Sequence, residues 1–334
     1  MADNHHKTLL PGRVSRSLSN VKNAVNRLLE AYRGSPESRR KHRAHLASLP
    51  TIQEGIQNLE RRFANKPDAP TDAPVFILSS GWRTGSTLVQ RLVMSSKKIL
   101  VWGEPYAYSG YVRRLAGSLL SFTPEYPFEM YLLRTHQQRG LDNDTWVANL
   151  YPNPESVLQA HRRFFQALFA EPAAVEGWPS WGIKATRLEH AHAVYLKWLF
   201  PRAKFLYVYR NPFDAYRSYH RFHKQIWYES FPNRPVLTPA AFGKHWQKLL
   251  KGFLTGHQEV NGLLVRYEDL CAGRLSVEHL ADYLQLDLNA EVLSVRITSR
   301  RANRDLYNPP IPAAALRILR RAVEPLASEL GYKA

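Results

Sequence analysis

One segment, residues 75–92, constrains the fold more than any other part of the chain. It begins with four apolar residues typical of a buried strand, passes through a turn bracketed by Gly81 and Gly85, and continues as an amphipathic helix pattern. A helix that starts directly after such a turn presents unsatisfied backbone N–H groups and the positive end of its dipole, and both favour an anion. The segment therefore predicts a phosphate-binding strand–turn–helix unit.

The turn differs from the loop of ordinary ATP and GTP hydrolases. A Walker A loop has four residues between its glycines and a Lys directly after the second glycine. Here three residues separate Gly81 from Gly85, Ser86 follows, and the nearest cation is Arg83 inside the turn. The spacing therefore disfavours an ordinary nucleotide hydrolase or kinase, although it keeps the phosphate site.

A second strand–helix unit carries another candidate anion site. Residues 204–210 form a buried-strand pattern, Asn211 and Pro212 break it, and a helix is expected over residues 213–223. Arg210 lies at the carboxyl end of the strand, and Ser218 lies eight positions later, about two helical turns into the segment. A guanidinium and a hydroxyl placed in this way can reach one anion.

Strands and helices alternate along the main part of the chain. We expect strands at 75–78, 99–102, 181–184, 205–209 and 263–267, and helices at 86–96, 155–169, 189–199, 240–255 and 276–284. This alternation predicts an α/β fold, a P-loop-like three-layer arrangement in which helices cover both faces of a mainly parallel sheet.

Charged and polar residues lie at or just after the carboxyl ends of all five expected strands. They are Arg83, Glu104, Lys184, Arg210 and Tyr267. Ligands of open α/β sheets bind beyond these ends, so the placement predicts one shared site.

Residues 1–73 differ in composition from the rest of the chain. Apolar residues recur at helical spacing over residues 21–29 and 52–63, and the basic run 39–43 separates the two stretches. Residues 66–74 have the composition of a linker. We expect a basic helical extension and linker over 1–73 and the main domain over 74–334. The extension either contacts an acidic partner or a membrane surface, or is a helical prefix that leaves its charge in solvent.

The net charge of +18, from 46 basic and 28 acidic residues, raises the question of nucleic-acid binding. A basic surface also suits an enzyme whose co-substrate is a polyanion, and no recognisable nucleic-acid motif accompanies the charge, so we expect no nucleic-acid partner. Cys271 is the single cysteine, which excludes an intramolecular disulfide. The chain contains no apolar run of about 18 residues, so we expect a soluble, cytoplasmic protein without a transmembrane segment.

Five blocks of sequence, in this order, resemble the sulfotransferase family that uses 3′-phosphoadenosine 5′-phosphosulfate (PAPS). They read GWRTGSTLVQRL, WGEP, WGIK, FLYVYRNPFDAYRS and LLVRYEDL, and the resemblance runs from residue 74 to the end of the chain. It implies a first loop that holds the 5′-phosphosulfate and an Arg–Ser pair that holds the 3′-phosphate. The Arg in the first loop is more similar to carbohydrate and tyrosyl-protein members than to cytosolic phenol and steroid members, which have Lys there.

The resemblance implies a role for each candidate residue. Arg83 contacts the 5′-phosphosulfate and the charge that develops on the leaving group, while Lys184 contacts the sulfuryl group. Arg210 and Ser218 hold the 3′-phosphate, and Tyr267 lies near the adenosine. The other loop residues supply backbone N–H groups and hydroxyls to the phosphate, and they are Thr84, Gly85, Ser86 and Thr87.

Glu104, at the exit of the second strand, is the candidate general base, because members of the Arg type resemble this chain in placing a carboxylate there. Phenol and steroid enzymes instead use a His two residues after their second cation, and that position is Thr186 in this chain. A carboxylate among cations is a weak base unless it is partly desolvated. Glu104 is therefore either the base or an ion-pair partner of Arg83 or Lys184.

Together, the residues and the resemblance predict a sulfotransferase in which a hydroxyl of a small molecule or glycan attacks sulfur in line, with no metal required. The segment 105–179 is rich in rings that suit stacking on a sugar or a phenol if they are exposed, and ordinary core packing if they are buried. These rings belong to Tyr106, Tyr108, Tyr111, Trp146, Tyr151 and Trp178. Two alternatives stay open: a phosphotransferase with an atypical loop and bound Mg²⁺, and a polyanion-binding module without chemistry.

Overall fold

The computed structural model describes residues 35–104, 106, 109–139, 148–222, 236, 238–295 and 311–333. Contacts divide the chain into two compact units, residues 1–49 and 50–334. The described part of the first unit is helix α2 (Pro36–Ala47), whose Lys41 and Glu37 form an ion pair at 2.9 Å. The predicted boundary near residue 73 therefore differs from the division of contacts, which lies between Leu49 and Pro50.

The second expected helical stretch belongs to the larger unit. Helix α3 (Ile52–Glu60) begins with a capping box, in which the Thr51 hydroxyl accepts from the Glu54 N–H and the Glu54 carboxylate accepts from the Thr51 N–H. Its residues Ile56 and Leu59 are buried in the main hydrophobic core. The apolar stripe of α3 therefore explains why the boundary between the units precedes it.

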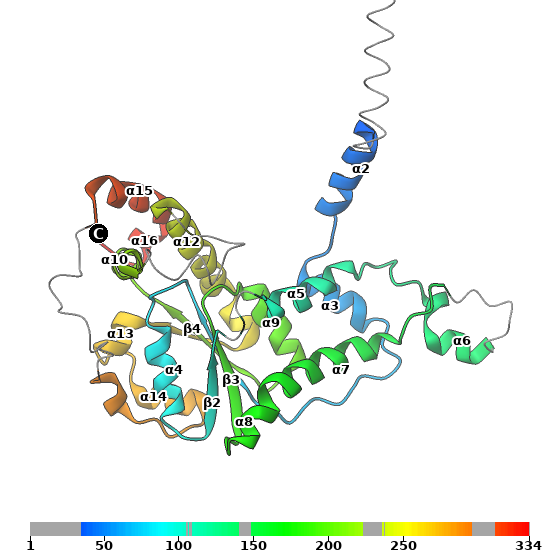
Figure 1. The fold of residues 1–334 in the computed structure, drawn as a ribbon, viewed down its shortest axis with the longest axis horizontal. Helices are drawn as coiled ribbons and strands as arrows, with labels where there is room; N and C mark the ends of the chain where they lie inside the picture. The colour runs from blue at the N-terminus through cyan, green and yellow to red at the C-terminus, as the bar shows by residue number, and fades with distance from the viewer. Residues whose placement is uncertain are drawn as a thin grey trace, which may run out of the picture. The chain divides into compact units, whose positions relative to one another are not determined.

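The five strands that the structure describes form one parallel sheet in the order β2-β3-β1-β4-β5 (Figure 1). They are β1 (Val75–Ser79), β2 (Ile99–Gly103), β3 (Ser180–Ala185), β4 (Lys204–Tyr209) and β5 (Leu263–Arg266). Each lies within two residues of its predicted bounds, which confirms the predicted α/β fold with a parallel sheet. One detail is corrected: β5 ends at Arg266, and Tyr267 begins a short helix instead of closing the strand.

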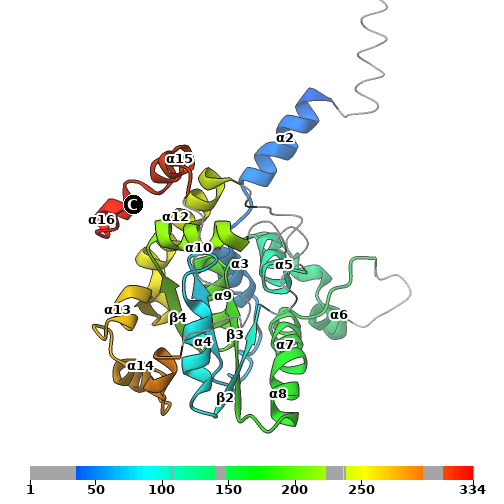
Figure 2. The ribbon, with the colours of Figure 1, turned by 60° about the vertical axis from the view of Figure 1, so that its left-hand side comes forward.

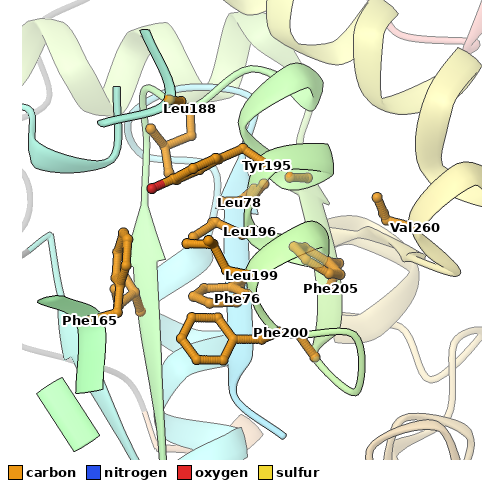
Figure 3. Close-up of a cluster of buried hydrophobic side chains, with 14 of the residues drawn as sticks. Phe76, Leu78, Phe165, Leu188, Tyr195, Leu196, Leu199, Phe200, Phe205 and Val260 are labelled. Atoms are coloured by element: carbon orange, nitrogen blue, oxygen red, sulfur yellow. The ribbon is translucent and has the colours of Figure 1, made fainter. Parts of the chain in front are cut away.

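Helices cover both faces of this sheet (Figures 1 and 2). On one face, α4 (Ser86–Met94) and α14 (Val277–Leu284) pack against the apolar residues of β1, β2, β4 and β5. On the other face lie α3, α7 (Pro154–Phe165), α9 (His190–Leu199) and α12 (Pro239–Gly256). Figure 3 shows Phe76 of β1 and Leu196 and Phe200 of the α9 segment packed together in this second core.

The remaining described elements complete the larger unit. They are α5 (Tyr111–Ser118), η1 (Leu119–Ser121), η2 (Glu129–Tyr131), α6 (Leu133–Arg139), the π-helical turn η3 (Gln166–Ala170), α8 (Glu171–Val175), α10 (Pro212–Phe222), η4 (His257–Val260), α13 (Tyr267–Cys271), η5 (Ala290–Leu293), α15 (Ala313–Val323) and α16 (Leu326–Glu329). Within the described part of the chain, no helix combines the length and the apolar character that crossing a membrane requires.

The strand order defines where a ligand site is expected. The chain leaves β1 toward β2 on one side of the sheet, and it leaves β4 toward β5 on the other side. Because β1 and β4 are neighbours, their carboxyl ends flank a topological switch point, which is where open α/β sheets bind ligands. The two candidate anion loops follow these two strands, and the Ser80 N–H donates to the Val208 carbonyl at 2.9 Å between them.

Candidate functional site

The first loop adopts a backbone conformation that glycines make possible. Gly81 and Gly85 have φ angles of 135° and 92°, and Arg83 between them has a left-handed φ of 62°. The loop is fixed from inside, because the hydroxyls of Ser79 and Thr84 donate to the Gly81 carbonyl at 2.8 and 3.2 Å. The predicted contribution of Thr84 to a phosphate therefore narrows to its backbone N–H, since its hydroxyl is buried against the loop itself.

Helix α4 begins directly after this loop. Gly85 occupies its N-cap position, and no side chain caps the helix. Ser86 is buried and Thr87 is exposed, so the first turn of the helix has one inward and one outward hydroxyl residue. A helix N-terminus without a side-chain cap offers backbone donors and a positive dipole end to an anion.

Tyr267 closes one side of the loop. A Cβ atom at Gly85 would lie 2.1 Å from Tyr267 Cδ2, so only glycine leaves room for this ring. The guanidinium of Arg210 lies over the same ring, 4.4 Å from its centroid. Burial raises the pKa of the Tyr267 phenol, which keeps this group neutral beside the site.

Arg210 faces the first loop with unused donor capacity. One of its terminal nitrogens, Nη1, donates to the Arg83 carbonyl at 3.3 Å. Its Nε is buried and has no hydrogen-bond partner among the described residues. A buried guanidinium nitrogen without a partner is costly unless an anion or water satisfies it, so this position fits a phosphate oxygen.

The Arg83 side chain reaches across to α10. Its Nε donates to the Ser218 hydroxyl at 2.9 Å. The structure therefore brings together the cation that was predicted for the 5′-phosphosulfate and the hydroxyl that was predicted for the 3′-phosphate. Four predicted residues form one contact chain at the β1–β4 switch point, and they are Tyr267, Arg210, Arg83 and Ser218.

Glu104 and Lys184 form a second group at the same edge of the sheet. The two side chains make an ion pair at 2.5 Å, with Lys184 only 9% exposed and Glu104 21% exposed. The Glu104 N–H also donates to the Lys184 carbonyl at 2.8 Å, which extends the pairing of β2 with β3 by one residue. Of the two partners that the sequence left open for Glu104, the structure pairs it with Lys184.

Thr186 is a residue of this group whose contact the sequence did not predict. Its hydroxyl donates to the second carboxylate oxygen of Glu104 at 2.9 Å. Lys184 and Thr186 point to the same side of the chain because they are two residues apart at the end of β3. Glu104 is thus held at both oxygens, yet a carboxylate has further lone pairs with which to accept a proton.

Helix α12 contacts the backbone carbonyls of two residues that directly follow strands, Thr186 after β3 and Arg210 after β4. Its His245 Nε2 lies 3.3 Å from the Thr186 carbonyl, and its Trp246 Nε1 donates to the Arg210 carbonyl at 3.0 Å. The His245 ring packs on Trp82 of the first loop, with centroids 5.0 Å apart. In the sequence, these contacts correspond only to a His and a Trp next to each other in an expected helix, and that pattern does not specify which residues they contact.

The family comparison confirms the resemblance seen in the sequence. The model of the family described as "Sulfotransferase family" matches residues 74–290, which is more than half of the chain. The chain belongs to the sulfotransferase family. This is a family of enzymes that use PAPS.

Solved structures that resemble this sulfotransferase are distant. The sulfotransferase domain of the Synechococcus PCC 7002 olefin synthase is 20% identical over 81% of this chain and 98% of its own, with a TM-score of 0.39. The sulfotransferase domain from the curacin biosynthetic pathway is 16% identical over 79% of this chain and 99% of its own, with a TM-score of 0.41. Mouse sulfotransferase SULT7A1, complexed with PAP, is 11% identical over 72% of this chain and 68% of its own, with a TM-score of 0.34. No curated protein sequence matches the chain.

The predicted site residues of this sulfotransferase thus fall into two groups at one edge of the sheet. The first group lines the β1–β4 switch point and contains Arg83, Thr84, Gly85, Ser86, Thr87, Arg210, Ser218 and Tyr267. The second group, Glu104 and Lys184, lies at the ends of β2 and β3. The Arg83 side chain is directed to Ser218 and not to Glu104, so the two groups meet through the backbone and through α12.

Proposed function

We propose that this sulfotransferase transfers the sulfuryl group of PAPS to a hydroxyl acceptor, giving a sulfate ester and adenosine 3′,5′-bisphosphate (PAP). One observation carries the proposal: the uncapped N-terminus of α4 and the Arg210–Ser218 pair face the same switch point and are joined through Arg83. Two candidate anion sites at one switch point suit a nucleotide with separate phosphate groups at its two ends.

The residues of the switch point divide the work of holding the donor. Backbone N–H groups at the start of α4 take the 5′-phosphosulfate, since the helix dipole adds to their hydrogen bonds. Arg210 offers its buried Nε and Ser218 its hydroxyl to the 3′-phosphate. Tyr267 supports the Arg210 guanidinium from below and places an aromatic ring beside the adenosine.

Lys184, Arg83 and Glu104 carry the transfer step. The acceptor oxygen attacks sulfur while the bond from sulfur to the bridging phosphate oxygen breaks, and negative charge grows on that oxygen. Lys184 and Arg83 stabilise this charge, and Glu104 accepts the proton of the acceptor hydroxyl. Lys184 and Thr186 fix the orientation of the carboxylate through contacts of 2.5 and 2.9 Å.

The Arg in the first loop supports assigning this chain to the type of sulfotransferase that acts on carbohydrates or tyrosyl proteins. In phenol and steroid members the base is a His two residues after the second cation, and this chain has Thr186 there. The Thr186 hydroxyl donates a hydrogen bond to Glu104, so the residue at the position of that His contacts the proposed base instead of acting as one. We therefore assign the role of base to Glu104, with a small-molecule or glycan hydroxyl as acceptor.

Isothermal titration calorimetry tests the donor. We expect PAP to bind without Mg²⁺, and adenosine 5′-phosphate, which lacks the 3′-phosphate, to bind at least about tenfold more weakly, because the contacts of Arg210 and Ser218 are then lost. A preference for ATP with Mg²⁺ would instead support a phosphotransferase.

Incubation with radiolabelled PAPS tests the chemistry. Transfer of label to an acceptor supports the proposed reaction. Salt-sensitive binding of polyanions without any transfer of label would instead indicate a binding module.

A further inference from the structure

Glu104 and Tyr106, which follow strand β2, adopt a backbone conformation that is rare for residues other than glycine. Glu104 has a φ angle of 47° and Tyr106 a φ angle of 49°, both in the left-handed region. Such residues cluster at functional sites, where the surrounding structure compensates for the strain. In this case the conformation directs the Glu104 carboxylate to Lys184, while the Tyr106 side chain stays 64% exposed.

Hydrogen bonds hold the Tyr106 backbone in a turn. Its carbonyl accepts from both the N–H and the hydroxyl of Ser109, at 2.8 and 2.6 Å. The Ser109 carbonyl in turn accepts from Arg114 Nε of α5 at 2.7 Å. The backbone that carries the exposed ring is therefore held at the start of α5.

Tyr106 is the outermost ring of a series that begins in the core. Its ring meets Tyr111 edge to face at 5.9 Å, and Tyr111 meets Phe164 edge to face at 5.3 Å. Phe164 packs against the buried core cluster. Tyr106 and Tyr111, respectively 64% and 36% exposed, thus form a preorganised aromatic surface that begins two residues after the proposed base.

We infer that Tyr106 and Tyr111 form a subsite for the acceptor, which binds a six-membered ring with a flat apolar face and directs a hydroxyl on that ring to Glu104. This inference rests on the proposed function, because it assigns the acceptor side of the same site. A rigid exposed ring binds such a face at little cost in side-chain entropy, and an aryl ring and a pyranose both present one. Because Tyr106 follows the proposed base by only two residues, the acceptor is favoured over a protein partner as the molecule that binds this surface.

The test measures how ring-bearing probes bind to the PAP-loaded protein. The probes are 4-nitrophenol and methyl β-D-glucopyranoside, whose dissociation constants are followed by ligand-observed NMR, and the two probes separate an aryl from a sugar preference. We expect Tyr106→Ala to weaken the preferred probe about 3- to 10-fold, the range that a single aromatic contact provides. Tyr106→Phe keeps the ring and is expected to bind the probe as the unaltered protein does.

Phe128→Ala is the matched control, because Phe128 is an exposed ring of the same segment, 50% exposed, that packs on Tyr126 and Tyr131 instead. It is expected to leave probe binding and PAP binding unchanged. Equal probe binding by Tyr106→Ala and the unaltered protein, or no binding of either probe, would overturn the inference. A change in molecular mass in solution on Tyr106→Ala, with probe binding unchanged, would make this surface an interface between copies of the chain.

Failure of this inference is distinguishable from failure of the proposed function. If neither probe binds, or if probe binding does not depend on Tyr106, while PAP still binds without Mg²⁺, only the inference about the acceptor subsite fails. Absence of PAP binding in the unaltered protein would refute the proposed function itself.

Discussion

Gly85 is the position at which the first loop and Tyr267 constrain each other most closely. Alanine at this site would carry a left-handed φ of 92° and a Cβ atom 2.1 Å from Tyr267 Cδ2. The backbone term costs about 1–2 kcal/mol, and forcing a methyl group into a packed contact costs about 1–3 kcal/mol. We therefore expect Gly85→Ala to lower the free energy of unfolding by roughly 2–5 kcal/mol, a large share of the usual total.

The two terms can be separated because only one depends on Tyr267. In a Tyr267→Ala background the steric term disappears, so Gly85→Ala is expected to cost only about 1–2 kcal/mol there. Urea unfolding of all four proteins gives this coupling energy, provided that the m-values agree. An equal cost of Gly85→Ala in both backgrounds would refute the reasoning that the ring fills the space above the glycine.

Three further substitutions test the roles of other residues. Glu104→Gln is expected to lower kcat about 10²–10⁴-fold, the usual contribution of a general base, while PAP affinity measured by calorimetry stays close to that of the unaltered protein; near-normal turnover would leave Glu104 only an ion-pair partner. Thr186→Val removes the 2.9 Å hydrogen bond to Glu104 and is expected to lower kcat about tenfold or more without weakening PAP, whereas Thr186→Ser restores the hydroxyl and the rate. Arg210→Lys loses the guanidinium fork and its contact with Tyr267, so calorimetry should show PAP bound about 10- to 100-fold more weakly and adenosine 5′-phosphate little affected; an equal loss for both nucleotides would contradict the assignment of Arg210 to the 3′-phosphate.

The fold was largely predictable because its signals are local. A buried parallel strand is a continuous apolar run, so all five strands could be found from sequence, and the alternation with helices predicted the layers. The same reasoning placed Tyr267 in a strand, but Tyr267 begins a helix. The extent of the extension, placed over residues 1–73, stays a prediction: the apolar stripe of α3 is visible in the sequence, but the core that it joins is formed by distant residues.

The site was predictable only as a set of residues at strand ends. The sequence indicated that Glu104 and Lys184 lie at one edge of the sheet, and the structure adds that they touch. The contacts of Arg83 with Ser218 and of His245 with Thr186 join residues 135 and 59 positions apart, and no pattern in one sequence specifies such pairs. Two predicted rings, Tyr108 and Trp146, lie outside the described residues. The cytoplasmic location and the acidic or membrane partner of the basic extension stay predictions.

Backbone strain gives a further reason, independent of the sequence motifs, to place the chemistry at this edge. Six residues other than glycine have a left-handed φ among the described residues, and they fall into two classes. Lys97, Asn261 and Gln285 lie at or just after the carboxyl ends of helices, where this conformation is the ordinary way to terminate a turn. The others end no helix and follow β1 and β2 at the site, and they are Arg83, Glu104 and Tyr106. Each costs about 1–3 kcal/mol, which the packing around it must offset. Arg83 and Glu104 are the proposed cation and base, and Tyr106 lies in a turn that Ser109 stabilises, so the strain at this edge accompanies the residues to which we assign the chemistry.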